Sequence, residues 1–250
     1  MKSDKKQSGI DKYFKAIDSL QKEAVETQFK ELVRIADRMV QTIIGGGRIF
    51  LFGTGHSHML AEEGFFRAGG LAQAVPIFST ALMLHEKPTF SSHLERTAGI
   101  AENLLNFYKP EPGEMIFVFS NSGVNRLPVE LAMLAKERGL FVVTISSFTY
   151  SKEAPLSTLG KRLDEVADIA LDNKGVSGDA LYKVDGTHWR VGSSSTIIGA
   201  LLWNCLLAEC AERMHENGYD LPVFASFNMS DAEDHNKGLL EKWQGLNPHL

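Results

Sequence analysis

Apolar residues recur at close to the helical period from the start of the chain to the triple glycine at residues 45–47. Ile17, Leu20 and Ile35 belong to this series, which predicts one long helix or a helix pair over residues 10–44. The glycines favour termination of the helix at that point. Because an apolar stripe of this length must be covered, we expect it to pack on its own domain or on a second subunit.

After residue 47, short and nearly continuous apolar runs alternate with helical patterns. The predicted strands cover residues 48–52, 72–78, 115–119, 140–146 and a short 169–171, and the predicted helices cover 58–67, 94–108, 127–138 and 194–215. Strands that alternate with helices form right-handed βαβ units. Apolar runs without polar alternation indicate burial on both faces. The pattern therefore predicts an α/β three-layer sandwich, in which a parallel sheet carries helices on both faces.

This pattern divides the chain into three parts: a helical N-terminal extension (residues 1–44), a central α/β domain (45–217) and a C-terminal tail with a helix (218–250). Residues 173–192 are rich in Gly, Ser and Asp and predict a long loop or lid. In the tail we expect an extended segment, followed by a helix from about residue 231 to residue 243.

The composition is that of an ordinary globular chain: 250 residues, 44% hydrophobic, with a net charge of −5. Such an acidic chain has no general attraction for nucleic acid or anionic membranes, and we expect neither as a partner. Residues 1–9 lack the apolar core of a signal peptide, and the apolar stretch over 196–207 is too short to span a bilayer, so we expect a cytoplasmic protein. Cys205 and Cys210 are expected to be buried thiols in one helix.

Three clusters of small and hydroxyl-bearing residues fall where open parallel sheets bind ligands, outside the carboxyl ends of the strands. They are Gly53-Thr54-Gly55-His56-Ser57, Ser120-Asn121-Ser122-Gly123, and Gly192-Ser193-Ser194-Ser195-Thr196 before the last long helix. Glycines let the backbone approach a ligand, and gathered hydroxyl and N–H donors suit a phosphate without any arginine. A helix cap, a turn or an exposed serine-rich loop would also explain each cluster alone.

A dinucleotide site is an alternative for the first cluster, because G-x-G after a strand is half of the Rossmann fingerprint. The third glycine of that fingerprint would stand where this chain has His58. The next predicted strand ends in Pro76-Ile77-Phe78, without an acidic residue that could hold a ribose. Both differences argue against a nucleotide.

The order GTGHS, then SNSG after MIFVF, then GSSST before an apolar helix resembles the SIS (sugar isomerase) domain over roughly residues 30–215. The resemblance implies a five-stranded parallel sheet flanked by helices, a homodimer or higher oligomer, and a phosphorylated sugar as ligand. It implies that Ser120 and Ser122 hold the phosphate and that Ser57 lines the sugar end. Where the family has E-T after the glycine, this chain has Val124-Asn125, which leaves Asn125 as a substitute donor.

The sequence also contains an A-E-E segment on the helix after the first loop. Phosphoheptose isomerases of this family carry a similar segment, and the resemblance makes Glu63 the analogue of their catalytic glutamate, with Glu62 as its rival. A solvated acidic pair remains the alternative. Unlike those enzymes, this chain has no histidine in its last long helix before His215. In this respect GSSST and the apolar helix are closer to the N-acetylmuramic acid 6-phosphate etherases.

The leading hypothesis is a phosphosugar isomerase that acts through an enediol, with Glu63 or Glu62 as base and His56, His58 or His188 as its partner. The alternatives are a phosphosugar etherase or lyase, a non-catalytic phosphosugar sensor, and a structural module. His85 also lies in a predicted loop and could act as an acid–base group. His58 and Glu62 are spaced i, i+4 and could reach one ion, but we expect no metal and no other cofactor.

Overall fold

Five parallel strands form the central sheet of the computed structural model, which describes residues 8–230 and 232–250. They are β1 (Ile49–Gly53), β2 (Ala74–Pro76), β3 (Met115–Phe119), β4 (Phe141–Ser146) and β5 (Ile169–Asp172), in the order β2-β1-β3-β4-β5. Every residue of β1 and β3 is buried, which explains why these strands read as continuous apolar runs. The predicted α/β class and five-stranded parallel sheet are confirmed.

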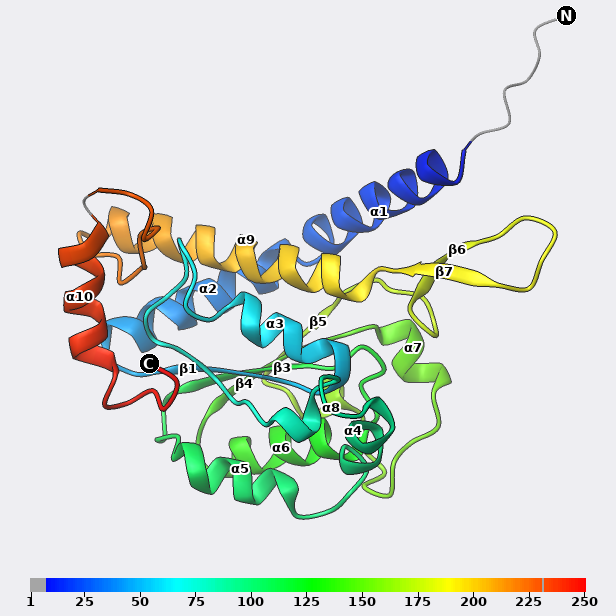
Figure 1. The fold of residues 1–250 in the computed structure, drawn as a ribbon, viewed down its shortest axis with the longest axis horizontal. Coiled ribbons are helices and arrows are strands. Elements are labelled where there is room, and N and C mark those ends of the chain that lie inside the picture. The colour runs from blue at the N-terminus through cyan, green and yellow to red at the C-terminus, as the bar shows by residue number, and fades with distance from the viewer. Residues whose placement is uncertain (1–7, 231) are drawn as a thin grey trace, which may run out of the picture.

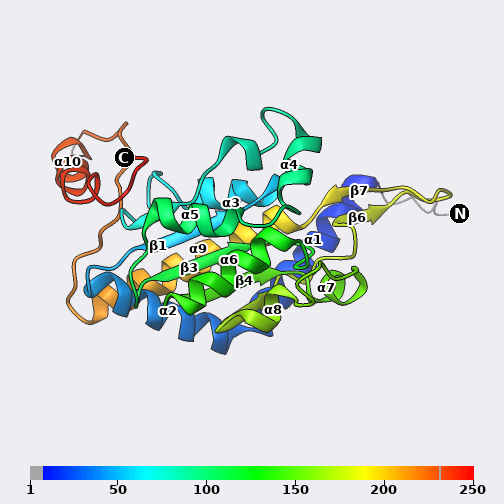
Figure 2. The same cartoon turned by 90° about the horizontal axis from the view of Figure 1, so that it is seen from below.

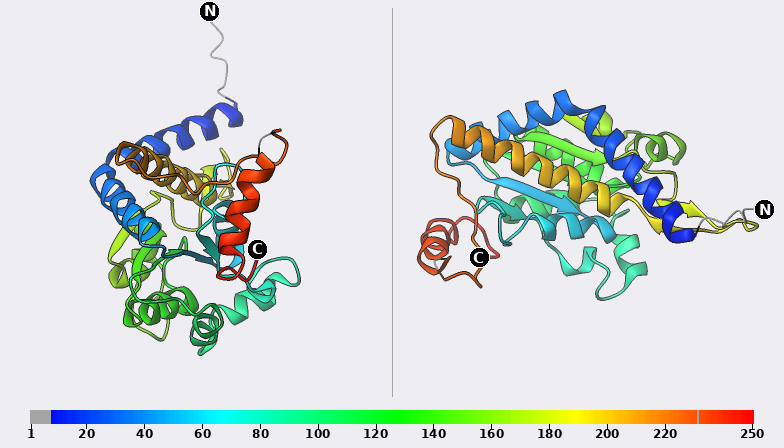
Figure 3. Two further views of the ribbon diagram at one scale, coloured as in Figure 1. Left: turned by 90° about the vertical axis from the view of Figure 1, so that its left-hand side faces the viewer. Right: turned by 90° about the horizontal axis from the view of Figure 1, so that it is seen from above.

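Helices cover both faces of the sheet (Figure 1). One face carries α2 (Phe29–Ile44), α3 (His58–Glu63) and α9 (Ser195–Glu216), with α1 (Gly9–Glu26) beyond them (Figure 3). The other face carries α5 (Ile100–Tyr108), α6 (Arg126–Glu137) and α8 (Leu163–Val166), as Figure 2 shows from below. The three predicted layers are therefore present.

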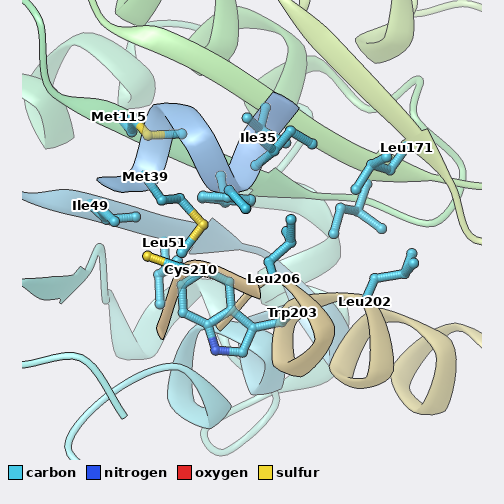
Figure 4. Close-up of a cluster of buried hydrophobic side chains, with 14 of the residues drawn as sticks. Ile35, Met39, Ile49, Leu51, Met115, Leu171, Leu202, Trp203, Leu206 and Cys210 are labelled. Atoms are coloured by element: carbon cyan, nitrogen blue, oxygen red, sulfur yellow. The ribbon is translucent and has the colours of Figure 1, made fainter. Parts of the chain in front are cut away.

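The larger of the two apolar layers joins the sheet to α2 and α9 (Figure 4). Met39, Leu51 and Trp203 pack there, and Trp203 meets the Phe117 ring edge-on at 5.2 Å between centroids. Cys210 lies in the same layer, and burial raises the pKa of its thiol to about 12. Both cysteines are free thiols, as expected, but only Cys210 is buried, whereas Cys205 is partly exposed.

Several helices begin or end elsewhere than predicted. The N-terminal stripe forms a pair of helices, α1 and α2, and α2 contributes its apolar side to the core of the sheet. The helix predicted over 94–108 is α4 (Pro88–Leu94) followed by α5, because Gly99 between them has a φ of +82°. Helix α3 stops at Glu63, before Gly64, where a Cβ atom would stand 2.3 Å from the Leu51 side chain.

The long loop or lid predicted over residues 173–192 is only in part a loop. Part of that segment forms a hairpin of β6 (Ala180–Lys183) and β7 (Arg190–Ser193), which projects from the sheet alongside α1 (Figure 1). Helix α1 supports the hairpin, since the Tyr13 hydroxyl donates to the Ser193 carbonyl at 2.6 Å. The glycines and polar residues that suggested a loop serve the turn and the exposed strand β7.

The tail folds back on the domain and ends in α10 (Ala232–Trp243). Val223 pairs with Leu71 in an isolated antiparallel bridge, and Trp243 packs with Ala72 and Phe224 in a small apolar cluster. The predicted start of the tail helix, residue 231, and residues 1–7 of the polar start lie outside the described residues. Two 3-10 turns, Gly55–Ser57 and Thr80–Leu82, a short α7 (Phe148–Glu153) and α4 complete the fold. Among the described residues, no helix combines the length and apolarity needed to cross a bilayer.

Candidate functional site

The loop after β3 and the start of α9 lie together at the carboxyl edge of the sheet. The Asn173 side chain, after β5, donates to the Asn121 side-chain oxygen at 2.9 Å. A Cβ atom on Gly175 would stand 3.3 Å from Ser194 Oγ and 3.5 Å from Asn121 Oδ1. The fold thus gathers two of the three predicted clusters around Gly175, although some seventy residues separate them in the sequence.

The β3 loop opens into a cavity of about 470 Å³ at the start of α6. Its lining includes Ser122, Asn125, Arg96, Arg126, Tyr150 and Thr158. The backbone N–H groups of Ser122, Val124 and Asn125 donate to no other described residue. Asn125 caps α6 without a side-chain hydrogen bond. Unpaired donors at the positive end of a helix favour an anion.

Two arginines line this cavity, whereas the sequence predicts a phosphate held without arginine. Arg126 is held by Glu130, at 3.2 Å, and by the Thr158 hydroxyl at 2.7 Å. Arg96 is paired with Glu95 at 2.8 Å. The position of Arg126 next to Asn125 in the sequence could have indicated it, whereas only the fold brings Arg96 here.

At the start of α9, a carboxylate already occupies the predicted phosphate donors. Asp179 Oδ1 accepts from the N–H groups of Ser194, at 3.1 Å, and Ser195, at 2.9 Å. The hydroxyls of the same two serines donate to Asp179 at 3.3 and 2.7 Å. Ser194 and Ser195 therefore serve as donors to Asp179, and the sequence did not indicate this residue.

Ser193 and Thr196 line a second cavity, of about 420 Å³, together with His56 and Met59 from the first loop. The first loop and the start of α9 thus face each other there. The structure therefore distributes the predicted binding residues over two cavities, with Ser122 and Asn125 at one and Thr196 and His56 at the other.

The first loop also contacts a glutamate that the sequence-based reasoning missed. The Thr54 hydroxyl donates to Glu95 Oε2 at 2.9 Å, and the Leu127 N–H donates to the Glu95 carbonyl at 2.9 Å. The Glu95 side chain is 13% exposed. Gly53 is required beside this contact, because a Cβ atom there would stand 2.4 Å from the Ser57 carbonyl oxygen. Glu95 therefore lies at the junction of the first loop and the start of α6.

The two glutamates of the A-E-E segment point in different directions. Glu63 pairs with Arg67 and accepts from the Asn204 side chain of α9 at 3.1 Å. Glu62 is exposed, and its Oε1 lies 3.4 Å from Nε2 of the buried His58. Only Glu62 is therefore close to a predicted catalytic histidine.

His188 lies apart from the other predicted site residues. It is on the exposed turn of the hairpin, where its ring packs on Trp189 with 4.3 Å between centroids. The hairpin that carries this turn projects away from the sheet (Figure 1).

Comparison with known proteins identifies the family of the chain. A family model described as the SIS domain matches residues 12–147. The UPF0309 proteins of Halalkalibacterium halodurans and Geobacillus kaustophilus are each 38% identical over 242 residues, which cover 96% of this chain and 97% and 96% of theirs. A phosphoheptose isomerase from Francisella tularensis has a similar fold, with a TM-score of 0.55 and 14% identity over 82% of this chain and 100% of its own. The chain belongs to the SIS domain family and, within it, to the UPF0309 proteins.

Proposed function

We propose that the chain binds a phosphorylated sugar with its phosphate at the Ser120–Asn125 loop. The observation that carries the proposal is the cavity at the start of α6, where unpaired N–H groups, Ser122 and Asn125 stand beside Arg96 and Arg126. A phosphate ester has acceptor oxygens for all of these donors, and the arginines supply charge that the acidic chain as a whole does not. The sugar extends from this loop toward the first loop and Thr54.

We propose further that the chain isomerises the sugar between its aldose and ketose forms through an enediol. This reaction moves a proton between neighbouring carbons and needs a carboxylate or imidazole close to both. Glu95 meets that need best, because Thr54 and the start of α6 hold it between the two loops. Glu62 and Glu63 remain the candidates from the sequence, with His58 and His56 as partners.

The experiment is a panel of hexose, heptose and amino-sugar 6-phosphates incubated with the full-length protein in deuterated water and followed by NMR. We expect isomerisation of a member of the panel with exchange at the carbon beside the carbonyl. Glu95→Gln should lower kcat at least about a hundredfold, while Glu63→Gln should retain turnover because its carboxylate is engaged with Arg67 and Asn204. Full turnover by Glu95→Gln would remove Glu95 as the base.

The second candidate is a phosphosugar etherase or lyase, and the observation in its favour is the lack of histidine in α9 before His215. N-acetylmuramic acid 6-phosphate therefore belongs in the panel, and cleavage of its ether with no isomerisation would favour this reading. A non-catalytic sensor would raise its melting temperature with a phosphosugar and convert none.

We also propose that two copies associate through α1 and the β6–β7 hairpin. Ile10 and Phe14 of α1 are 82% and 69% exposed, and Trp189 and Val191 of the hairpin are also exposed. Both elements project beyond the sheet (Figure 1), so a second copy could cover them and bring His188 to a neighbouring site. Light scattering tests this: a dimer is expected, and Phe14→Asp with Trp189→Asp should give a monomer.

A further inference from the structure

His58, Glu62 and His85 meet beside the first loop, and the proposed function names the first two only as a candidate base and partner and gives His85 no task. One nitrogen or oxygen atom from each side chain lies within 4.8 Å of the other two. His58 and Glu62 come from successive turns of α3, whereas His85 comes from the segment between Thr80–Leu82 and α4. The two imidazole rings meet edge-on, with 5.3 Å between centroids.

The buried His58 is oriented in the way that metal-binding histidines are. Its Nδ1 pairs with the backbone carbonyl of Gly55. A carbonyl only accepts, so Nδ1 carries the proton and Nε2 keeps its lone pair. His58 is 4% exposed, and its Nε2 makes no hydrogen bond to any described residue. Buried polar atoms are normally paired, and the carboxylate of Glu62 and the imidazole of His85 lie next to this one.

The spacing fits an ion between the side chains better than a direct hydrogen bond. His58 Nε2 and Glu62 Oε1 are 3.4 Å apart, which is long for a hydrogen bond. Two ligand atoms bound to one tetrahedral zinc ion are separated by about the same distance, roughly 3.4 Å. Glu62 and His85 are both exposed, and their ligand atoms lie within 4.8 Å of each other and of that of His58.

We propose that His58, Glu62 and His85 bind a divalent transition-metal ion of the zinc class. Two imidazole nitrogens and one carboxylate favour Zn²⁺ or Co²⁺ over Mg²⁺ and Ca²⁺, which prefer oxygen ligands. Three protein ligands leave a fourth position for water or for a substrate oxygen, as in catalytic zinc sites. The sequence led us to expect no metal, because only the fold brings His85 to the His58–Glu62 pair.

Ion binding stands apart from the proposed function; only the use of the fourth position by a sugar oxygen rests on it. The test therefore measures the metal alone. Tag-free full-length protein is stripped with a chelator and titrated with Zn²⁺ by calorimetry and with Co²⁺ by visible absorption. We expect a tetrahedral Co²⁺ spectrum and saturation at equal amounts of ion and chain.

Glu62→Gln and His85→Ala should each weaken Zn²⁺ binding at least about tenfold. Both side chains are exposed, so these variants keep the fold, whereas His58→Ala changes the core. His93→Ala, an exposed histidine of α4, is the matched control and should bind as the parent does. All three variants should keep a thermal shift with inorganic phosphate, so that failure of the metal site and failure of the phosphate site are distinguishable. Failure of the parent to bind either ion, equal binding by Glu62→Gln and His85→Ala, or an equal loss in His93→Ala overturns the proposal.

Discussion

From the contact between Asp179 and the start of α9 we predict how much the folded protein loses in stability when Asp179 is replaced. Its carboxylate accepts from two N–H groups and two hydroxyls, and so acts as the cap of a long helix. Loss of a helix cap costs about 1–2 kcal/mol. Asp179 also has a φ of +66°, a region that alanine adopts at an added cost of roughly 1 kcal/mol and glycine at none. We therefore expect Asp179→Gly to lower the free energy of unfolding by about 1–2 kcal/mol and Asp179→Ala by about 2–3 kcal/mol.

The assay is urea unfolding followed by circular dichroism, supported by the melting temperature. For a chain of this size, a loss of 2 kcal/mol corresponds to a fall of about 4–8 °C. Asp220→Ala is the control, because Asp220 is exposed and should change the free energy by less than about 0.5 kcal/mol. The reasoning is refuted if Asp179→Ala unfolds with the stability of the parent, and the backbone part of it is refuted if alanine and glycine cost the same.

Three further predictions concern groups away from the candidate site. Glu114 forms a buried ion pair with Arg48 through two contacts, at 2.7 and 2.8 Å. Glu114→Ala should therefore lower the free energy of unfolding by about 3–5 kcal/mol in the same urea assay. A loss below about 1 kcal/mol would contradict this prediction. Burial raises the pKa of the Cys210 thiol to about 12, so a thiol reagent at neutral pH should label Cys210 only in urea; rapid labelling of the native protein would disprove this. Burial lowers the pKa of His249, which contacts the Tyr108 hydroxyl at 2.7 Å, so the folded state binds fewer protons than the unfolded state. The stability that His249 contributes is present above the unfolded-state pKa and lost as the pH falls toward the folded value. In buffer that contains a chelator, the melting temperature of His249→Gln should fall less on acidification than that of the parent protein. An equal fall in the two proteins would contradict this prediction.

The predictable part of the candidate site is the part that depends on local sequence. Gly53 ends β1, and Ser120 and Gly123 belong to the loop that follows β3. Both strands have clear apolar runs, so the rule that parallel sheets bind ligands at their carboxyl edge locates these residues. Arg126 immediately follows Asn125, so the same rule could have identified Arg126 as a site residue. The sequence could not indicate Glu95, Arg96 or His85, because each is brought to the edge by the path of the chain between β2 and β3.

The β6–β7 hairpin and the contacts of Asp179 are features that local sequence does not predict. A short pair of strands with glycine and polar residues looks like a loop, because its strand β7 is exposed and has no apolar alternation to reveal it. Its support is long-range: Tyr13 of α1 contacts Ser193, and Asp179 binds Ser194 and Ser195. Neither contact leaves a periodic pattern in the sequence.

The amino-acid sequence by itself determined the α/β class, the parallel sheet and the edge at which the loops gather, because burial on both faces requires apolar runs and βαβ units have one favoured hand. The tertiary structure decided how those loops are used. It paired Ser194 and Ser195 with Asp179, turned Glu63 toward Asn204, and set His85 beside His58 and Glu62. Contacts of this kind depend on where distant segments cross, and the free energy of each side chain there is set by neighbours that local sequence does not specify.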